Sequence, residues 1–193
     1  CFEKSAQIGG HWNTDYDALH LITPKSSSFF DGFPMPADYP VYPSRDQIKT
    51  YMNAYTDQFG LREKITFNTA VSAIKPLGDN GEAGWDVTLA DGTTKRYAGV
   101  LVANGHLWDC KVPEVGKRFT GISIHSGEYR NVQQIKGKVL VVGFGNSGCD
   151  LAVDAAQARL DTTIAIRRGQ LFQPKTVFGL PRGELPLLGQ LAP

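Results

Sequence analysis

The clearest pattern in the chain lies in residues 137–168, where an apolar run is followed by glycines and then by an alanine-rich stretch. Residues 139–142 form an unbroken run of Val and Leu, which is typical of a parallel strand buried on both faces. After a glycine loop at 143–148, the pattern predicts a helix over 149–158 and a second strand over 163–166. Strand, glycine loop, helix and strand in this order predict a βαβ unit of about 30 residues.

A second periodic segment predicts a helix that begins after Ser44 and ends before Gly60. Ser44 is a typical N-cap, Gln47 completes a capping box with it, and Gly60 supplies the C-terminal stop. Apolar residues at helical spacing predict that one face packs in the core: Ile48, Tyr51, Met52, Tyr55 and Phe59.

From residue 65 the hydrophobic period changes to two, which predicts strands over 65–74, 85–90 and 93–97. Asp91-Gly92 is the signal of a two-residue hairpin turn, so these strands should form a small antiparallel β-meander. Residues 100–103 predict a further, buried strand. Residues 22–43 contain five prolines and are predicted to be irregular.

Composition excludes several classes of partner. The 193 residues carry 20 Lys and Arg against 19 Asp and Glu, and this net charge of +1 argues against nucleic acid or an acidic membrane surface. No apolar run approaches the ~20 residues of a membrane-spanning helix. Because the chain begins at Cys1 rather than Met and ends at Pro193 without a closing element, we expect it to be part of a longer protein.

The cysteines and histidines do not predict a disulfide framework or a metal site. Cys1, Cys110 and Cys149 are an odd number without CxxC spacing, which fits a reducing, cytoplasmic compartment. The four histidines show no HExxH or HxH grouping, so no metal ligand is predicted.

The glycine loop has the spacing GxGxxG between a strand and a helix, the context of a dinucleotide-binding turn. Gly143 allows a sharp turn, Gly145 allows the backbone to approach a pyrophosphate, and Gly148 allows the helix to pack closely. The free N–H groups of the helix N-terminus then face the anion. A glycine-rich turn without a ligand is the alternative.

The end of the second predicted strand distinguishes the dinucleotides. An NAD site usually has an Asp or Glu there for the ribose hydroxyls, whereas this chain has Arg167 and Arg168. Two guanidinium groups suit a 2′-phosphate, so NADPH is favoured over NADH. The alternative is two solvated surface arginines.

The start of the chain resembles part of a second nucleotide site. Residues 1–4 resemble the end of a Rossmann strand with Glu3 at the ribose position, and Gly9-Gly10-His11-Trp12 follows at a spacing typical of FAD-binding proteins. An exposed acid near a terminus is the alternative interpretation of Glu3.

Residues 119–130 contain the motif FxGxxxHxxx(Y/F), which is typical of one enzyme family. Together with this motif, the chain contains the opening FEKSxxIGGxW, the segments VANG and GNSGCD and the turn RRG. In this combination it resembles the flavin-containing monooxygenases of the bacterial type. Its LxxPK segment is similar to that of YUCCA-type enzymes. The motif residues are Phe119, Gly121, His125 and Tyr129.

The resemblance implies an α/β fold with two dinucleotide-binding, Rossmann-like domains, both incomplete, and a small antiparallel β-meander. Residues 1–112 would belong to the FAD-binding domain, with the meander at about 65–98, and residues 113–193 to the NADP-binding domain, with the linker motif at 119–130. His125 would help to set the geometry of the connection between the domains and is not expected to be a general base.

The resemblance also implies two sets of cofactor contacts. FAD contacts are expected at Glu3, His11, Trp12, Thr23 and Val71. NADP contacts are expected at Gly143, Gly145, Asn146, Ser147, Gly148, Arg167 and Arg168. Many family members have an Asn before the Thr or Ser near the flavin, and Ile22 stands there in this chain, so the substrate range is not predicted.

The activity implied by the resemblance is hydride transfer from NADPH to FAD, addition of O2 to form a flavin C4a-hydroperoxide, and oxygenation of a nucleophilic nitrogen or sulfur in a small molecule. The cofactor carries this chemistry, so no catalytic residue is assigned. Tyr129-Arg130 disfavours the Baeyer–Villiger branch, which stays open beside a flavin disulfide reductase and a non-catalytic NADP-binding fragment. The 193 residues alone are expected to be inactive, and a homodimer is possible for the whole protein.

Overall fold

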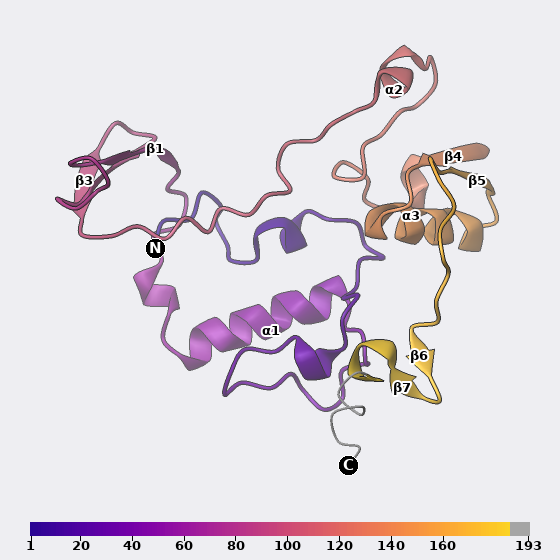
Figure 1. Cartoon of the computed structure of the whole chain (residues 1–193), viewed down its shortest axis with the longest axis horizontal. Coiled ribbons are helices and arrows are strands. Elements are labelled where there is room, and N and C mark those ends of the chain that lie inside the picture. The colour runs from indigo at the N-terminus through magenta and orange to yellow at the C-terminus, as the bar shows by residue number, and fades with distance from the viewer. Residues whose placement is uncertain (186–193) are drawn as a thin grey trace. The chain divides into compact units, whose positions relative to one another are not determined.

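The computed structural model describes residues 1–185, and the chain divides into two compact units (Figure 1). The first unit combines Cys1–Asn13 with Met52–Asp109, and the second combines Thr14–Tyr51 with Cys110–Pro193. The division falls within helix α1 (Arg45–Gln58). The end of the predicted NADP-binding domain, residues 186–193, lies outside the described residues.

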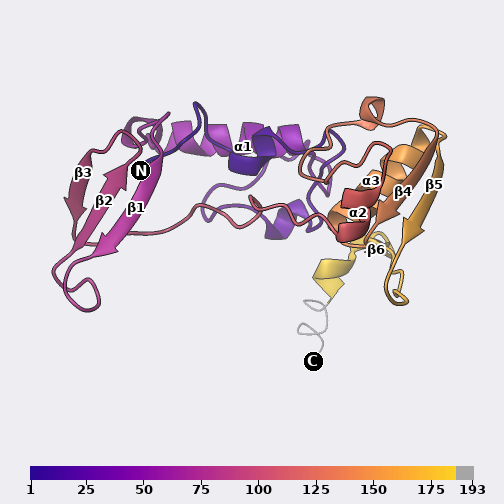
Figure 2. The same cartoon turned by 90° about the horizontal axis from the view of Figure 1, so that it is seen from above.

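The first unit contains a three-stranded antiparallel sheet in the order β1-β2-β3 (Figure 2). Its strands are β1 (Val71–Pro76), β2 (Trp85–Leu89) and β3 (Thr94–Tyr97). Val87 and Leu89 of the central strand are buried, as expected for a sheet with one face against a core. The predicted β-meander is therefore present.

Two details of the meander differ from the prediction. The first strand begins at Val71 rather than at residue 65, because residues 66–69 bond to residues 1–5 instead and Asn68 turns the chain with φ 53°. The hairpin loop holds three residues, 90–92, closed by the Leu89 N–H donating to the Thr93 carbonyl at 2.8 Å. A two-residue type I′ turn needs positive φ at both central positions, and only Gly92 has it (φ 86°).

The predicted buried strand over residues 100–103 is wrong for the described part of the chain. These residues are irregular, and the side chains of Leu101 and Val102 are 98% and 68% exposed. A parallel strand is stable only beside a neighbouring strand, and residues 1–185 place none next to this segment.

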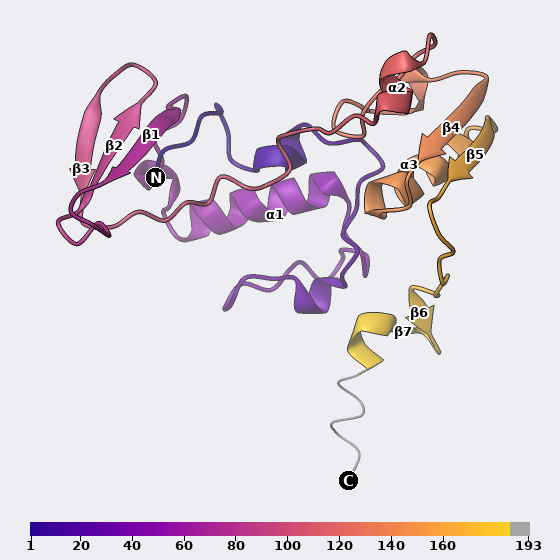
Figure 3. The same ribbon diagram turned by 45° about the horizontal axis from the view of Figure 1, so that its top comes forward.

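The second unit contains the predicted βαβ unit, made of β4 (Lys138–Val142), α3 (Asn146–Gln157) and β5 (Asp161–Ala165). The two strands are parallel, in a register that pairs Lys138 with Asp161 and Val142 with Ala165. The helix lies along the strands (Figure 3), with the small side chains of Ala152 and Ala155 buried. Since α3 covers only one face, the prediction of a strand buried on both faces is wrong: Leu140 and Val142 are 62% and 59% exposed.

Helix α1 begins with the predicted capping box. The Ser44 N–H donates to Gln47 Oε1 at 2.9 Å, and the Gln47 N–H donates to Ser44 Oγ at 3.3 Å. Ile48 and Tyr51 are buried as predicted. Phe59 is 48% exposed, so its assignment to the core is wrong: it lies beyond the last residue of α1, with its ring 4.7 Å from that of Tyr55.

Residues 22–43 are largely irregular, as predicted, but a lysine organises them. Lys25 Nζ donates to the backbone carbonyls of Pro36, Ala37 and Tyr39 at 3.0, 2.7 and 2.5 Å. One charged group thus satisfies three carbonyls of a proline-rich stretch that lies outside any strand or helix.

Replacing this lysine should destabilise the loop. We expect Lys25→Met to lower the free energy of unfolding by ~1.5–3 kcal/mol, because the three carbonyls lose a charged donor while the aliphatic stem is kept. Chemical denaturation of the full-length protein measures the effect, with Lys64→Met as a control of an exposed lysine. Equal stability of the Lys25→Met and Lys64→Met proteins would contradict the role of Lys25.

Short elements complete the described chain. These are the 3-10 helices Gly10–Asn13, Lys25–Ser27, Arg62–Lys64, Val132–Gln134 and Arg182–Glu184, helix α2 (Glu114–Arg118), and strands β6 (Thr176–Val177) and β7 (Leu180–Pro181). Within residues 1–185, no helix has the length and apolar character needed to cross a membrane.

Candidate functional site

The carboxyl ends of β4 and β5 meet at one edge of the parallel pair. The Gly143 N–H donates to the carbonyl of Ala165, the last residue of β5, at 2.9 Å, which extends the pairing one residue beyond the end of β4. The glycine loop therefore leaves the sheet beside the segment that carries Arg167 and Arg168. In open α/β sheets, ligands bind at this edge.

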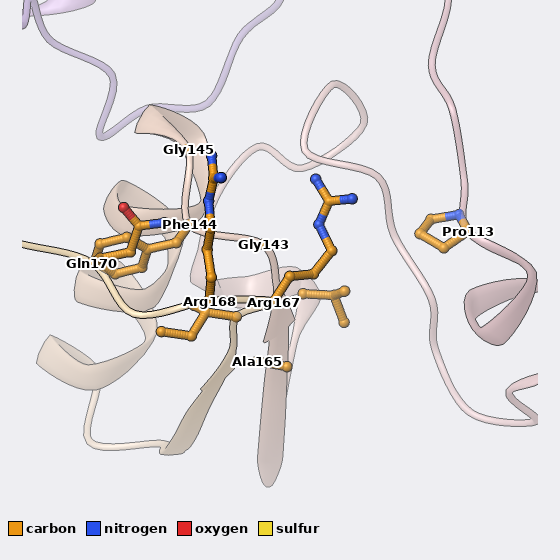
Figure 4. A pocket seen from close by; sticks show the side chains of 10 residues that line it. Pro113, Gly143, Phe144, Gly145, Ala165, Arg167, Arg168 and Gln170 are labelled. Atoms are coloured by element: carbon orange, nitrogen blue, oxygen red, sulfur yellow. The ribbon is translucent and has the colours of Figure 1, made fainter.

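A cavity of about 800 Å³ lies at this edge (Figure 4). The side chains of Arg167 and Arg168 extend to the same side of the strands, toward the glycine loop. The residues that line the cavity come from the end of β4, the glycine loop, the end of β5 and two neighbouring positions: Pro113, Val142, Gly143, Phe144, Gly145, Ala165, Ile166, Arg167, Arg168 and Gln170.

Each glycine of the loop meets a different steric requirement. Gly143 has φ +112°, a conformation that L side chains rarely adopt. A Cβ at Gly148 would lie 2.6 Å from the Gly143 carbonyl oxygen, so the helix can pack against the loop only without a side chain there. A Cβ at Gly145 would meet no heavy atom within 4 Å, so the backbone there borders open space that a ligand can enter.

Helix α3 presents its N-terminus beside this open space. The N–H groups of the first turn, at Asn146, Ser147 and Gly148, have no partner within the helix, and the Cys149 N–H makes the first helical bond, to Gly145 at 3.0 Å. The N-cap Gly145 has no side chain that could satisfy them. Unpaired N–H groups and the positive end of the helix dipole fit a pyrophosphate.

The charge of the cavity fits a second phosphate. Arg167 and Arg168 are exposed guanidinium groups, and none of the ten lining residues is acidic. A plain ribose would find no carboxylate acceptor among these residues, whereas a 2′-phosphate would find two bidentate donors.

Glu3 ends a short extended segment in the first unit. Phe2 pairs with Thr66 in a parallel bridge, the Glu3 N–H donates to the Thr66 carbonyl at 3.0 Å, and the Thr69 N–H donates to the Glu3 carbonyl at 2.9 Å. The Ser5 N–H donates to Glu3 Oε1 at 2.7 Å, which holds the carboxylate at the end of the extended segment.

Other predicted FAD contacts are distributed between the two units. His11 and Trp12 lie in the 3-10 helix Gly10–Asn13 of the first unit, with ring centroids 5.1 Å apart, and Val71 begins β1 in the same unit. Thr23 belongs to the second unit, where its hydroxyl lies 2.7 Å from that of Ser28. The FAD contacts themselves stay a prediction.

Comparison with known proteins identifies the family. A family model described as "Flavin-binding monooxygenase-like" matches residues 1–178. The chain belongs to this family. Flavin-containing monooxygenase 5 of Mus musculus is 34% identical over 188 residues, covering 88% of this chain and 35% of the relative. The indole-3-pyruvate monooxygenase YUCCA1 of Oryza sativa subsp. japonica is 31% identical, covering 92% and 44%.

Solved structures support the same fold. The flavin-containing monooxygenase from Stenotrophomonas maltophilia aligns with a TM-score of 0.79 at 26% identity, covering 91% of this chain and 52% of that one. A mutant cyclohexanone monooxygenase from Rhodococcus sp. Phi1, bound to NADP+, aligns with a TM-score of 0.70 at 25% identity, covering 90% and 34%. The chain thus spans about a third to a half of these relatives, and the predicted Rossmann-like flavoprotein fold and family are confirmed.

The residues of the family motif have different surroundings in the structure. Phe119 is 62% exposed, and a Cβ at Gly121 would lie 2.5 Å from its ring. His125 hydrogen-bonds to residues of its own turn. Its Nδ1 accepts from the Gly127 N–H at 3.1 Å, and its carbonyl accepts from the Tyr129 N–H at 3.1 Å. Tyr129 is buried, which the motif alone did not indicate.

Sequence reasoning missed several residues around the glycine loop. Phe144 and Gln170 line the cavity, and Tyr16 bonds to Asp150 of α3. Tyr129 is a predicted motif residue, but its bond to Asp154 of α3 is not predicted. The four-residue spacing of the two aspartates could have marked a shared helix face. No sequence pattern connects Tyr16 to a residue 134 positions away.

The three cysteines are the groups that the alternative of a flavin disulfide reductase would require. Cys1, Cys110 and Cys149 are free thiols in the structure. Within residues 1–185 no group of three His, Cys, Asp or Glu side chains could hold a metal ion.

Proposed function

We propose that this chain is part of an NADPH- and FAD-dependent monooxygenase that oxygenates a nucleophilic nitrogen or sulfur in small molecules. The observation that carries the proposal is the glycine loop and the arginine pair at one strand edge of a chain from the flavin-binding monooxygenase-like family.

The residues at this edge have separate tasks in the proposal. The first turn of α3 would hold the pyrophosphate with its backbone N–H groups, and Gly145 would admit it. Arg167 and Arg168 would bind the 2′-phosphate and so select NADPH. When bound, NADPH supplies a hydride and FAD activates oxygen; the protein positions both cofactors and excludes water.

The flavin half of the proposal rests on the first unit. Glu3 would accept hydrogen bonds from the ribose of FAD, and His11, Trp12 and Val71 would lie near the same cofactor. We assign residues 1–112 to the FAD-binding domain and residues 113–193 to the NADP-binding domain, so Thr14–Tyr51 of the second unit, with Thr23, would belong to the FAD-binding domain. The chain alone lacks the length of its relatives, so we propose that it is inactive in isolation.

A Baeyer–Villiger activity is the second candidate, because a cyclohexanone monooxygenase is among the structural neighbours. The residues Tyr129-Arg130 in the family motif favour oxygenation of nitrogen or sulfur instead. The two reactions differ in substrate and product and can be separated by one assay.

We expect the full-length protein to convert N,N-dimethylaniline or an alkyl aryl thioether to its N-oxide or sulfoxide, with consumption of NADPH. Mass spectrometry of the products, with cyclohexanone as the competing substrate, makes the distinction. A lactone from cyclohexanone with no N-oxide or sulfoxide would favour the second candidate, and no oxygenated product from any of the three would contradict the proposal.

A further inference from the structure

Two buried tyrosines hold the helix of the glycine loop. The Tyr16 hydroxyl donates to Asp150 Oδ2 at 3.0 Å, and the Tyr129 hydroxyl donates to Asp154 Oδ2 at 2.6 Å. Each tyrosine is only 3% exposed. Both aspartates belong to α3, so a pair of hydrogen bonds to charged acceptors fixes this helix from one side.

The contacts run along one face of α3 up to its first turn. Asp150 and Asp154 are four residues apart and therefore share a face. Ser147, one turn nearer the N-terminus, lies near the Tyr16 phenol. The two tyrosine rings lie against each other, with centroids 6.4 Å apart. We call Tyr16 and Tyr129 the tyrosine clamp.

The clamp is itself anchored. Asp17, next to Tyr16, donates its N–H to the Arg130 carbonyl at 2.8 Å and accepts from Asn131 Nδ2 at 2.9 Å. Arg45, at the start of α1, donates to Asp17 Oδ1 at 2.9 Å. The segments that carry the two tyrosines are thus bonded to each other and to α1, so the clamp can resist movement of α3.

The two phenols act as donors over the whole physiological range of pH. Burial is the largest effect, and it raises the pKa of Tyr16 and of Tyr129 above the ordinary value for tyrosine. The neighbouring aspartates act in the same direction, and at Tyr16 Ser147 offsets part of the rise. Both stay protonated and can donate to a carboxylate. Removal of a phenol would leave a half-buried carboxylate without its donor, which allows α3 to shift.

We propose that Tyr16 and Tyr129 are positioning residues for dinucleotide binding: they set the orientation of α3 and thereby aim the N–H groups of residues 146–148 at the pyrophosphate. The inference rests on the proposed function, because it concerns the same site. The inference extends the proposed function, because it assigns a role to Tyr16, Asp150 and Asp154. It also gives Tyr129 of the family motif a role in holding α3.

The site offers a way to separate positioning from general damage. The pyrophosphate is held by α3, whereas the 2′-phosphate is held by Arg167 and Arg168, which follow β5 and do not belong to the helix. The affinity for a ligand without a pyrophosphate, such as 2′-AMP, should depend on the two arginines and not on α3. A shift of α3 should weaken NADP+ and leave 2′-AMP unaffected.

The experiment compares Kd values of NADP+ and 2′-AMP in the full-length protein and in its Tyr16→Phe and Tyr129→Phe variants. We expect the Kd of NADP+ to rise by about tenfold in each variant, from the loss of one hydrogen bond to a charged group, and the Kd of 2′-AMP to stay unchanged. Asp154→Asn keeps an acceptor for Tyr129 and should bind NADP+ more tightly than Tyr129→Phe does. Tyr97→Phe, which removes the hydroxyl of an exposed tyrosine on β3 of the first unit, is the control and should bind both ligands as the unaltered protein does.

The outcomes separate the two proposals. Unchanged NADP+ binding in both phenylalanine variants overturns the positioning role, and an equal loss of NADP+ and 2′-AMP also overturns it, because it indicates general loss of structure. If the unaltered protein binds 2′-AMP and NADP+ but the variants do not differ, the proposed function stands alone. If the unaltered protein binds neither ligand, the proposed function fails and the positioning role fails with it.

Discussion

Gly145→Val is expected to abolish NADP+ binding while the melting temperature of the protein stays nearly unchanged. The open space around Gly145 explains both the loss of binding and the unchanged melting temperature. Gly145 has φ −83°, which any residue can adopt, and a Cβ there would meet no heavy atom within 4 Å, so the folded protein can accept valine. The valine side chain would fill the space that the pyrophosphate needs. The loss should be roughly 3 kcal/mol or more, about a hundredfold in Kd.

Gly148→Ala supplies the matched contrast in the same loop. Its Cβ would lie 2.6 Å from the Gly143 carbonyl oxygen, so the loop or the helix must move. This variant should lose NADP+ binding and also ~1–3 kcal/mol of stability. Isothermal titration and thermal denaturation of the full-length protein measure both quantities. Normal NADP+ affinity in Gly145→Val would show that the glycine loop does not hold the dinucleotide.

Arg167→Ala is expected to weaken NADPH binding far more than NADH binding. The guanidinium follows β5 and lines the cavity, where it can form a charged hydrogen bond to a 2′-phosphate that NADH does not have. Loss of one such bond should cost ~1–3 kcal/mol, or about 5- to 150-fold in the Kd of NADPH. Arg168→Ala should act in the same direction.

The control for the arginines is Arg118→Ala, on helix α2, because Arg118 is exposed and does not line the cavity. It should leave the affinities for NADPH and NADH as they are. Equal loss of the two dinucleotides in Arg167→Ala would refute the phosphate role and favour solvated surface arginines.

The sequence predicts the parts of the site that depend on local chemistry. The glycine loop lies between β4 and α3 as predicted, because a positive φ at Gly143 and a close approach at Gly148 each demand glycine whatever the rest of the fold. The capping box of α1 is local in the same sense. Such features require only neighbours along the chain.

The failures involve features that depend on distant partners. The strand that holds Leu140 would be buried on both faces only if a second layer covered it, and the described residues do not provide one. Residues 100–103 would form a strand only beside a neighbouring strand, which is also absent from the described residues. The bond from Tyr16 to Asp150 joins residues with no common pattern, so only the structure shows it. Phe59 is a local exception: it fits the helical period but lies past the last residue of α1.

Anaerobic titration of the full-length protein with NADPH and with NADH, followed by the visible absorbance of the flavin, tests the central claim most directly. We predict that the purified protein is yellow and that NADPH bleaches the flavin at far lower concentration than NADH does. A colourless protein, or bleaching by both dinucleotides at the same concentration, would contradict a site in which a phosphorylated nicotinamide dinucleotide feeds electrons to FAD.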